Sequence, residues 1–110
     1  MGKLIDAAVA HFSSLELREV RIPEWTDDVF YAKNLTLADM AKLSTRAQED
    51  TWDYMCYVII FGLQDSQGEP VLDIGDKVKL KSHTSKLVTE RIASEILSAQ
   101  TSTEEERVKN

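Results

Sequence analysis

The most regular run of apolar residues in the chain lies between residues 50 and 63. Six apolar side chains recur there at the three- and four-residue spacing of one helix face: Trp52, Met55, Cys56, Ile59, Ile60 and Leu63. This spacing predicts an α-helix, and the apolar residues between these positions predict that it is buried on more than one side. Asp50 or Thr51 is the expected N-cap, and Gly62 with the turn-forming residues 64–70 is expected to end the helix.

The first 14 residues carry a second apolar stripe at helical spacing. It consists of Leu4, Ile5, Ala8, Val9 and Phe12. The stripe predicts a short amphipathic helix. Because no good capping residue precedes it, we expect this helix to be held loosely.

From residue 15 to Ile22 the pattern changes to alternation of apolar and charged residues, with one slip at residues 18 and 19. Alternation predicts a half-buried strand, and the slip suggests a bulge. Pro23 is expected to end this strand, and the β-rich segment 29–33 predicts the returning strand. We therefore expect a β-hairpin over about residues 17–33, supported by the helices or by another subunit because an isolated hairpin is marginal in water.

A helix is predicted over about residues 36–48, with Thr36 as its cap and Asp39 in a capping-box contact. Its expected inward face consists of Leu37, Met40, Ala41, Ser44 and Ala47. The link to the central helix is so short that the two helices are expected to pack together, antiparallel or sharply angled.

After the turn at residues 64–70, Asp73 is a candidate cap for a short helix that ends at Ser82. The alternation of lysines with Val78 and Leu80 fits a strand equally well, so both remain open. The last helix is predicted over about residues 84–99. Its expected inward face consists of Leu87, Val88, Arg91, Ile92, Glu95 and Ile96.

These elements predict an α+β, mostly helical fold in which an N-terminal helix and a β-hairpin precede a core of about three to four helices. With 110 residues, of which 43% are hydrophobic and 29% charged, the chain suits one globular domain over residues 1–100. The polar stretch 101–110 contains no apolar cluster and is expected to be a mobile acidic tail.

The charge balance narrows the range of partners. A net charge of −6 argues against nucleic acid or an anionic membrane, because binding to phosphate needs a basic patch. Four lysines do cluster near His83, at positions 77, 79, 81 and 86, and a solvated face is the simplest interpretation of them. Cys56 is the single cysteine, so no intrachain disulfide is expected, which suits a reducing cytoplasm.

No constellation of residues suggests catalysis, a metal or a cofactor. The two histidines and Cys56 lack the spacing of zinc ligands, and the four scattered glycines form no phosphate-binding loop. Glu104–Glu106 has the pattern of a solvated charge run rather than of a metal cluster. The residues therefore indicate a small, non-enzymatic domain without a cofactor.

Three stretches resemble the tail assembly chaperones of long-tailed, siphovirus-type bacteriophages. They are Val20–Trp25 followed by Val29–Thr36, then Tyr57–Leu72, and finally Ser85–Leu97 with the end Glu104–Asn110. They are similar to the family's "VPEWG … VYVR.LT" opening, its "LVDEDGNPLF" turn and its closing helix. Two positions depart from this pattern: Thr26 replaces the usual glycine, and residues 64–67 are only partly acidic.

The resemblance implies a non-catalytic protein of the host cytoplasm that is absent from the mature virion. Such chaperones bind the tape measure protein, keep it soluble and help recruit the tail tube protein. A homo-oligomer, open or spiral, is expected, since many weak contacts suit an elongated partner.

Trp25, Phe30 and Tyr31 are the candidate interface residues because they lie outside the predicted helical core. For Trp25, two interpretations remain: a lid over the core, or an anchor that contacts a partner. The rival functions for the chain are a structural head–tail joining or tail-completion protein of the virion, a regulator that binds a basic target, and, with least support, an enzyme.

Overall fold

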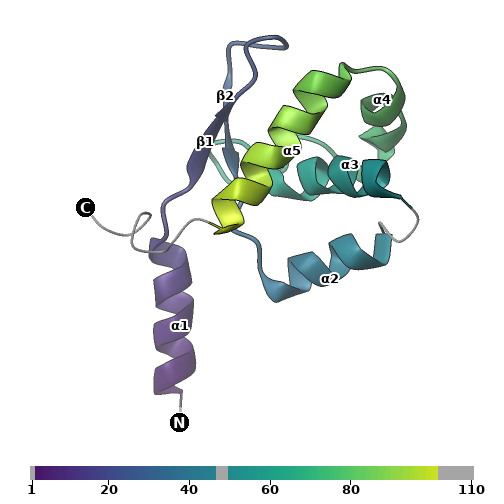
Figure 1. Cartoon of the computed structure of the whole chain (residues 1–110). Coiled ribbons are helices and arrows are strands. Elements are labelled where there is room, and N and C mark those ends of the chain that lie inside the picture. The colour runs from purple at the N-terminus through teal and green to yellow at the C-terminus, as the bar shows by residue number, and fades with distance from the viewer. Residues whose placement is uncertain (1, 47–49, 102–110) are drawn as a thin grey trace.

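The computed structural model describes residues 2–46 and 50–101, which form an α+β fold dominated by helices (Figure 1). The helices are α1 (Lys3–Ser14), α2 (Leu37–Arg46), α3 (Thr51–Gly62), α4 (Lys77–Ser82) and α5 (Lys86–Thr101), with a short 3-10 helix η1 (Ile74–Asp76) before α4. The strands are β1 (Arg18–Arg21), β2 (Val29–Ala32) and β3 (Leu63–Gln64). This arrangement confirms the predicted fold class of a helix and a hairpin followed by a helical core.

The central helix α3 begins and ends almost where its sequence predicts. Asp50 is the N-cap, and its side chain accepts a hydrogen bond of 2.6 Å from the backbone N–H of Asp53. From Cys56 to Leu63, every residue except Phe61 is buried, which confirms that this helix is enclosed on several sides. Trp52, expected on the core face, is instead 49% exposed because it lies in the first turn, at the edge of the core.

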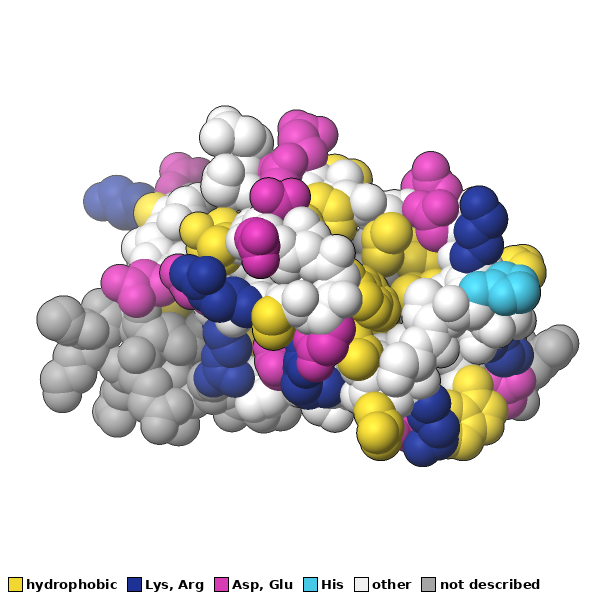
Figure 2. Space-filling view, turned by 90° about the horizontal axis from the view of Figure 1, so that it is seen from above, with side chains coloured by type: hydrophobic (Ala, Val, Ile, Leu, Met, Phe, Trp, Pro, Cys, Tyr) yellow, Lys and Arg dark blue, Asp and Glu magenta, His cyan; other side chains and the backbone are white. Residues whose placement is uncertain are grey.

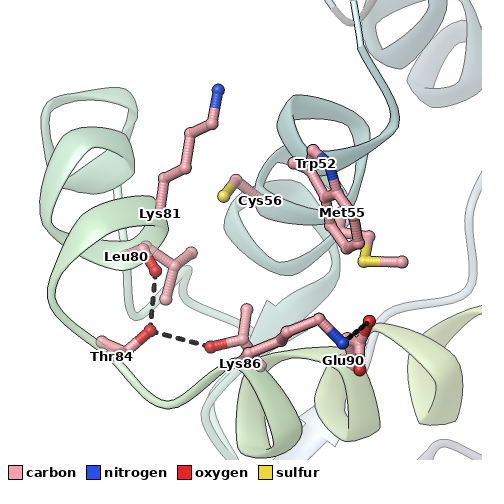
Figure 3. Close-up of a pocket in the computed structure, with 9 residues that line it drawn as sticks. Trp52, Met55, Cys56, Leu80, Lys81, Thr84, Lys86 and Glu90 are labelled. Atoms are coloured by element: carbon pink, nitrogen blue, oxygen red, sulfur yellow. Dashed lines mark hydrogen bonds and ion pairs between the residues drawn. The ribbon is translucent and has the colours of Figure 1, made fainter.

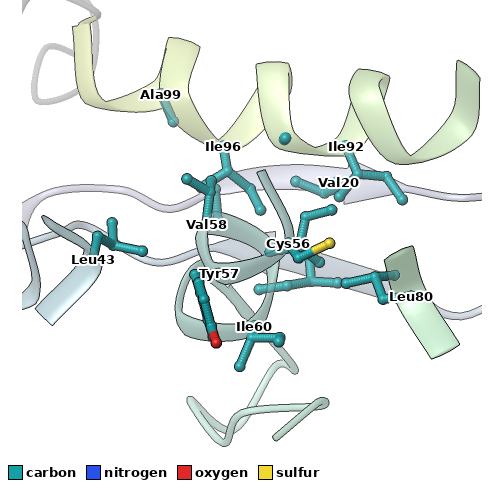
Figure 4. Close-up of a cluster of buried hydrophobic side chains, with 14 of the residues drawn as sticks. Val20, Leu43, Cys56, Tyr57, Val58, Ile60, Leu80, Ile92, Ile96 and Ala99 are labelled. Carbon is teal, nitrogen blue, oxygen red and sulfur yellow. The ribbon is translucent and has the colours of Figure 1, made fainter. Parts of the chain in front are cut away.

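Helix α5 packs across α3 and the hairpin, and the buried side chains between them form the core (Figure 4). In this core, Ile92, Ile96 and Ala99 point from α5 towards α3, and Val20 of β1 lies beside Ile92. Of the predicted face of α5, Ile92 and Ile96 are buried and Val88 packs against the core. Arg91 and Glu95 are only partly buried and form an ion pair of 3.5 Å, and Leu87 is 76% exposed. Leu87 lies five positions before Ile92, which turns its side chain about 140° away from that of Ile92.

The face that helix α2 presents to the core matches the predicted one only in part. Thr36 and Asp39 do form the expected capping box, with reciprocal hydrogen bonds of 3.0 and 3.1 Å. The residue that α2 buries is Leu43, whereas Leu37 is 90% exposed. Met40 of the predicted face does pack against the core, whereas Ala41 and Ser44 are exposed. Turning Met40 and Leu43 inward removes more apolar area from water than turning Ala41 and Ser44 inward would. Ala47 and the predicted end near residue 48 lie outside the described residues.

The hairpin is antiparallel and pairs Arg18 with Ala32 and Arg21 with Val29. The register is continuous, so the predicted bulge is wrong: pairing starts only at residue 18, beyond the first half of the alternation. The two-residue strand β3 adds a third strand beside β2, directly after α3. So short a strand has no periodicity from which a sequence could predict it.

The segment that follows β3 contains a tight turn and a short helix. Gly68 adopts a φ of 83°, and the Asp65 side chain accepts hydrogen bonds from the N–H groups of Gln67 and Glu69. Asp73 caps η1 in a capping box with Asp76, and α4 follows at once. This settles the open choice between helix and strand for residues 73–82 in favour of helix.

Helix α1 contributes nothing to this core. It stands apart from the other elements in Figure 1, and none of its 12 residues is buried. The predicted helix therefore exists, but its apolar stripe lies on the surface.

Candidate protein-interaction surfaces

The three candidate interface residues lie in the hairpin. Trp25 is in the turn between β1 and β2 and is 41% exposed. Phe30 and Tyr31 are neighbours in β2, so their side chains point to opposite faces of the sheet. Phe30 packs against the core, on the same face as its partner Val20. Phe30 and Tyr31 thus do not share one patch on the sheet, and a role of the three residues in binding stays a prediction.

Hydrogen bonds connect the turn that contains Trp25 to α5. The guanidinium of Arg91 makes two hydrogen bonds to the Glu24 carboxylate, of 2.6 and 3.0 Å, and a third of 3.3 Å to the carbonyl of Arg21. These hydrogen bonds from Arg91 lower the pKa of Glu24. Because the residue before Trp25 is anchored in this way, the turn presents the indole in a defined place.

A pocket of about 250 Å³ lies on the other side of α5, between α3, α4 and the start of α5 (Figure 3). Trp52, Met55 and Cys56 line it from α3, and Leu80 lines it from α4. The hydroxyl of Thr84 lies 2.6 Å from the Leu80 carbonyl and 2.8 Å from the Thr89 hydroxyl, so the polar atoms at this end are satisfied. The pocket is therefore apolar in its lining, with its polar groups already paired.

Lys86 and Glu90 form one rim of the pocket. Their side chains make an ion pair of 3.0 Å, and the Lys86 ammonium lies 5.6 Å from the centre of the Trp52 ring. This cation–π contact holds the exposed indole beside the pocket opening. An aromatic ring beside an apolar hollow with a charged rim is the composition expected of a contact for a protein side chain.

A cluster of charges lies at the opposite rim, where α3 begins. Asp53 accepts from the ammonium groups of Lys81 at 2.8 Å and Lys77 at 2.9 Å, and Lys81 also lies 3.3 Å from Asp50. These hydrogen bonds, first from Lys81 and then from Lys77, lower the pKa of Asp53 and raise those of the two lysines. Most of the predicted lysine cluster is thus paired with carboxylates, so it is no open basic patch.

The surface view agrees with this pairing (Figure 2). Acidic and basic side chains are interspersed over the visible face, and hydrophobic side chains gather between them. No single sign of charge dominates this face.

A second hollow, of about 530 Å³, lies where α3 runs into β3. Its apolar lining includes Ile60, Phe61, Leu63, Pro70 and Leu72. Lys33, Asp39 and Lys42 lie on the α2 side. These two hollows lie at opposite ends of α3.

Among the described residues, no group of three or more His, Cys, Asp or Glu is placed to hold a metal ion. Burial raises the pKa of the Cys56 thiol, which keeps it protonated and unreactive. No helix within the described ranges is both long and apolar enough to cross a membrane.

The sequence reasoning missed the pocket beside Trp52. It assigned Trp52 to the core face because spacing alone does not show where a helix leaves the core. The available signal was the position of Trp52 in the first turn, between Asp50 and Asp53. Acidic residues on both sides are a mark of a helix end that faces water.

Comparison with solved structures finds a protein of similar fold. The chain is similar to the tail assembly chaperone of bacteriophage HK97, with a TM-score of 0.64 and 12% sequence identity. The match covers 81% of this chain and 85% of that one. No protein-family model and no curated protein matches the sequence. At this identity the likeness shows a shared fold.

Proposed function

We propose that this chain is a non-catalytic tail assembly chaperone of a long-tailed phage. It binds the tape measure protein, keeps it soluble and helps to recruit tail tube subunits. It acts in the host cytoplasm and is absent from the finished virion. The observation that carries this proposal is the fold, which matches a phage tail assembly chaperone over 81% of the chain.

The surfaces of the chain support this role. A chaperone for a long helical partner needs small apolar contacts that can be repeated along it, rather than one deep site. The pocket beside Trp52 and the exposed Trp25 are contacts of that size. Each copy then contributes weakly, and a homo-oligomer of many copies, open or spiral, supplies the avidity.

Co-expression with the tape measure protein of the same phage tests the proposal. We expect the tape measure protein to stay soluble and to co-purify with this chain, whereas without the chain it aggregates. Chain left free beside aggregated tape measure protein would contradict the proposal. Detection of the chain in purified virions would favour a structural head–tail joining or tail-completion protein instead.

Substitutions in the hairpin test whether its residues form the predicted interface. Trp25→Ala is expected to weaken co-purification by on the order of tenfold in affinity, the size typical of an aromatic interface anchor. Tyr31→Ala tests the other face of β2. Leu37→Ala is the matched control, because Leu37 is a 90% exposed apolar residue on a different element. Equal binding by Trp25→Ala and Leu37→Ala would remove Trp25 from the interface.

A further inference from the structure

The second hollow, where α3 runs into β3, combines an apolar lining with basic side chains at its rim. Ile60, Phe61 and Leu63 form part of the lining, and Lys33 and Lys42 lie on the side of α2. With a volume of about 530 Å³, it is the larger of the two hollows beside α3. An apolar hollow of this size with a few charged groups at its edge suits a segment of protein that carries apolar and charged side chains together.

The two lysines at this rim keep capacity for an anion. Lys42 is exposed and forms no ion pair with the described residues. Lys33 lies 3.4 Å from the Asp39 carboxylate, and 43% of its side chain stays exposed. The two carboxylates in the lining, Asp39 and Asp73, already accept backbone N–H groups as caps of α2 and η1. The α2 side of the hollow therefore holds two ammonium groups against one carboxylate.

The end of α5 is held next to the same rim. The Gln100 side chain donates a hydrogen bond to the carbonyl of Lys33 and accepts one from the N–H of Leu35, each of 2.9 Å. These bonds join the last turn of α5 to the connection between β2 and α2, which lies beside it in Figure 1. The chain that follows Thr101 therefore starts close to the backbone of Lys33.

Residues 102–110, which lie outside the described residues, contain groups complementary to the hollow. Glu104–Glu106 supplies three consecutive carboxylates, and Val108 is the apolar side chain that follows them. An extended chain advances at most about 3.6 Å per residue, so Glu104 can lie up to about 10 Å from Thr101, and Val108 up to about 25 Å. The acidic run can thus reach the lysine whose carbonyl Gln100 binds.

We propose that residues 104–108 fold back onto the second hollow of their own chain. The carboxylates of Glu104–Glu106 pair with Lys33 and Lys42, and Val108 enters the apolar lining. Exposed ion pairs are weak, but a short linker holds the segment at an effective concentration on the order of millimolar, which a separate partner does not have. The contact is reversible, so the segment competes with any partner that binds the hollow. Because it lies within one chain, this contact does not depend on the proposed function.

Paramagnetic relaxation in the full chain tests the contact. A spin label is attached at Asn110→Cys, and the labelled parent is the control for Cys56, which is buried. We expect broadened amide signals for Lys42, Phe61 and Gly68, which line the hollow, and unchanged signals for Leu87 at the far end of α5. Unbroadened signals around the hollow, or equal broadening at Leu87, would overturn the proposal.

Charge reversal tests the role of the rim. Lys42→Glu is expected to remove the broadening, whereas the matched control Lys79→Glu, at an exposed lysine outside the lining of the hollow, should leave it unchanged. Glu105→Lys combined with Lys42→Glu should restore the contact, which a variant that merely disturbed the fold would not do. About 1 M salt, where the Debye length is about 3 Å, should weaken the broadening in the parent. Equal effects of Lys42→Glu and Lys79→Glu would contradict the pairing.

A mixing experiment separates a contact within one chain from a contact between copies. Spin-labelled chain without isotopes is added to isotope-labelled chain without a spin label. The hollow signals of the isotope-labelled chain are expected to remain sharp, because its own segment carries no label. Broadening as strong as that in the doubly labelled chain would show that the segment binds another copy, and it would overturn the proposal.

Discussion

At the scale of single residues, Gly62 is a glycine that close packing requires, rather than one that a turn requires. Sequence reasoning treats it as a helix stop, and α3 does end there. Among the described residues, however, the only positive φ belongs to Gly68. A Cβ atom on Gly62 would lie 2.7 Å from Cγ2 of Ile96, closer than real Cβ contacts. Gly62 is therefore a point of close approach between α3 and α5.

Gly62→Ala is accordingly expected to destabilise the fold by about 1–3 kcal/mol, the usual cost of forcing an extra methyl group into a filled core. The measurement is the free energy of unfolding in urea. Ile96→Ala removes the obstructing atom at a cost of its own, so the double variant should be less destabilised than the sum of the single variants. Strict additivity would mean that the close contact with Ile96 does not limit this position.

Among single residues, the helix caps are the ones that the sequence predicts well. Asp50 and Thr36 cap the helices at which they were expected, and Asp73 caps the 3-10 helix η1 that leads into α4. A cap acts on backbone groups two or three residues away, so its signal is local. The contact of Gly62 with Ile96 joins residues 34 positions apart, and no local pattern contains it.

At the scale of elements, the sequence predicts where the helices lie better than how they face. All four predicted clear helices are present, yet Leu37 and Leu87 point to solvent instead of the core. Both leucines lie in or near the first turn of their helix, before it reaches its neighbours. Apolar spacing identifies a helix, but only the tertiary contacts show which of two neighbouring stripes is covered.

The ion pairs between α3 and α4 make stability depend on pH in a predictable direction. Hydrogen bonds from Lys81 and Lys77 lower the pKa of Asp53 below its ordinary value of 3.8. Asp53 therefore stabilises the fold fully above that value, and its contribution is lost as the pH falls through the lowered pKa. The pKa values of Lys77 and Lys81 are raised above 10.5, so their share is complete below 10.5 and is lost as the pH rises through the raised values.

Asp53→Asn should consequently reduce the free energy of unfolding at pH 7. The difference from the parent should shrink as the pH is lowered through the acid range, because the parent then loses the same charge. Urea unfolding at a series of pH values measures both curves. Asp27→Asn, at an exposed carboxylate in the hairpin turn, is the control and should leave the curve nearly unchanged. A constant difference between Asp53→Asn and the parent at every pH would show that the ion pairs add nothing.

At the scale of the whole molecule, the candidate surfaces lie on different elements around one core. Trp25 is held by the Glu24–Arg91 contact on the hairpin side of α5, and Trp52 lies beside the pocket between α3, α4 and α5. The stripe of α1 stands apart from both (Figure 1). The sequence shows the apolar residues that make these surfaces, but their separation depends on the path of α5, which is set by long-range packing.

Because these surfaces are separate, single substitutions can show which of them binds the tape measure protein. If the pocket receives an apolar side chain from a partner helix, Trp52→Ala removes one wall together with its cation–π contact to Lys86, 5.6 Å from the ring. We expect affinity for the tape measure protein to fall by on the order of tenfold. Stability should change little, because Trp52 is already 49% exposed.

Co-purification of Trp52→Ala and Trp25→Ala, each checked for an unchanged urea midpoint, compares the two surfaces directly. A loss with Trp52→Ala alone would assign binding to the pocket; a loss with Trp25→Ala alone would assign it to the hairpin. Because the two side chains are held by separate contacts, a loss with both would mean that the partner spans α5.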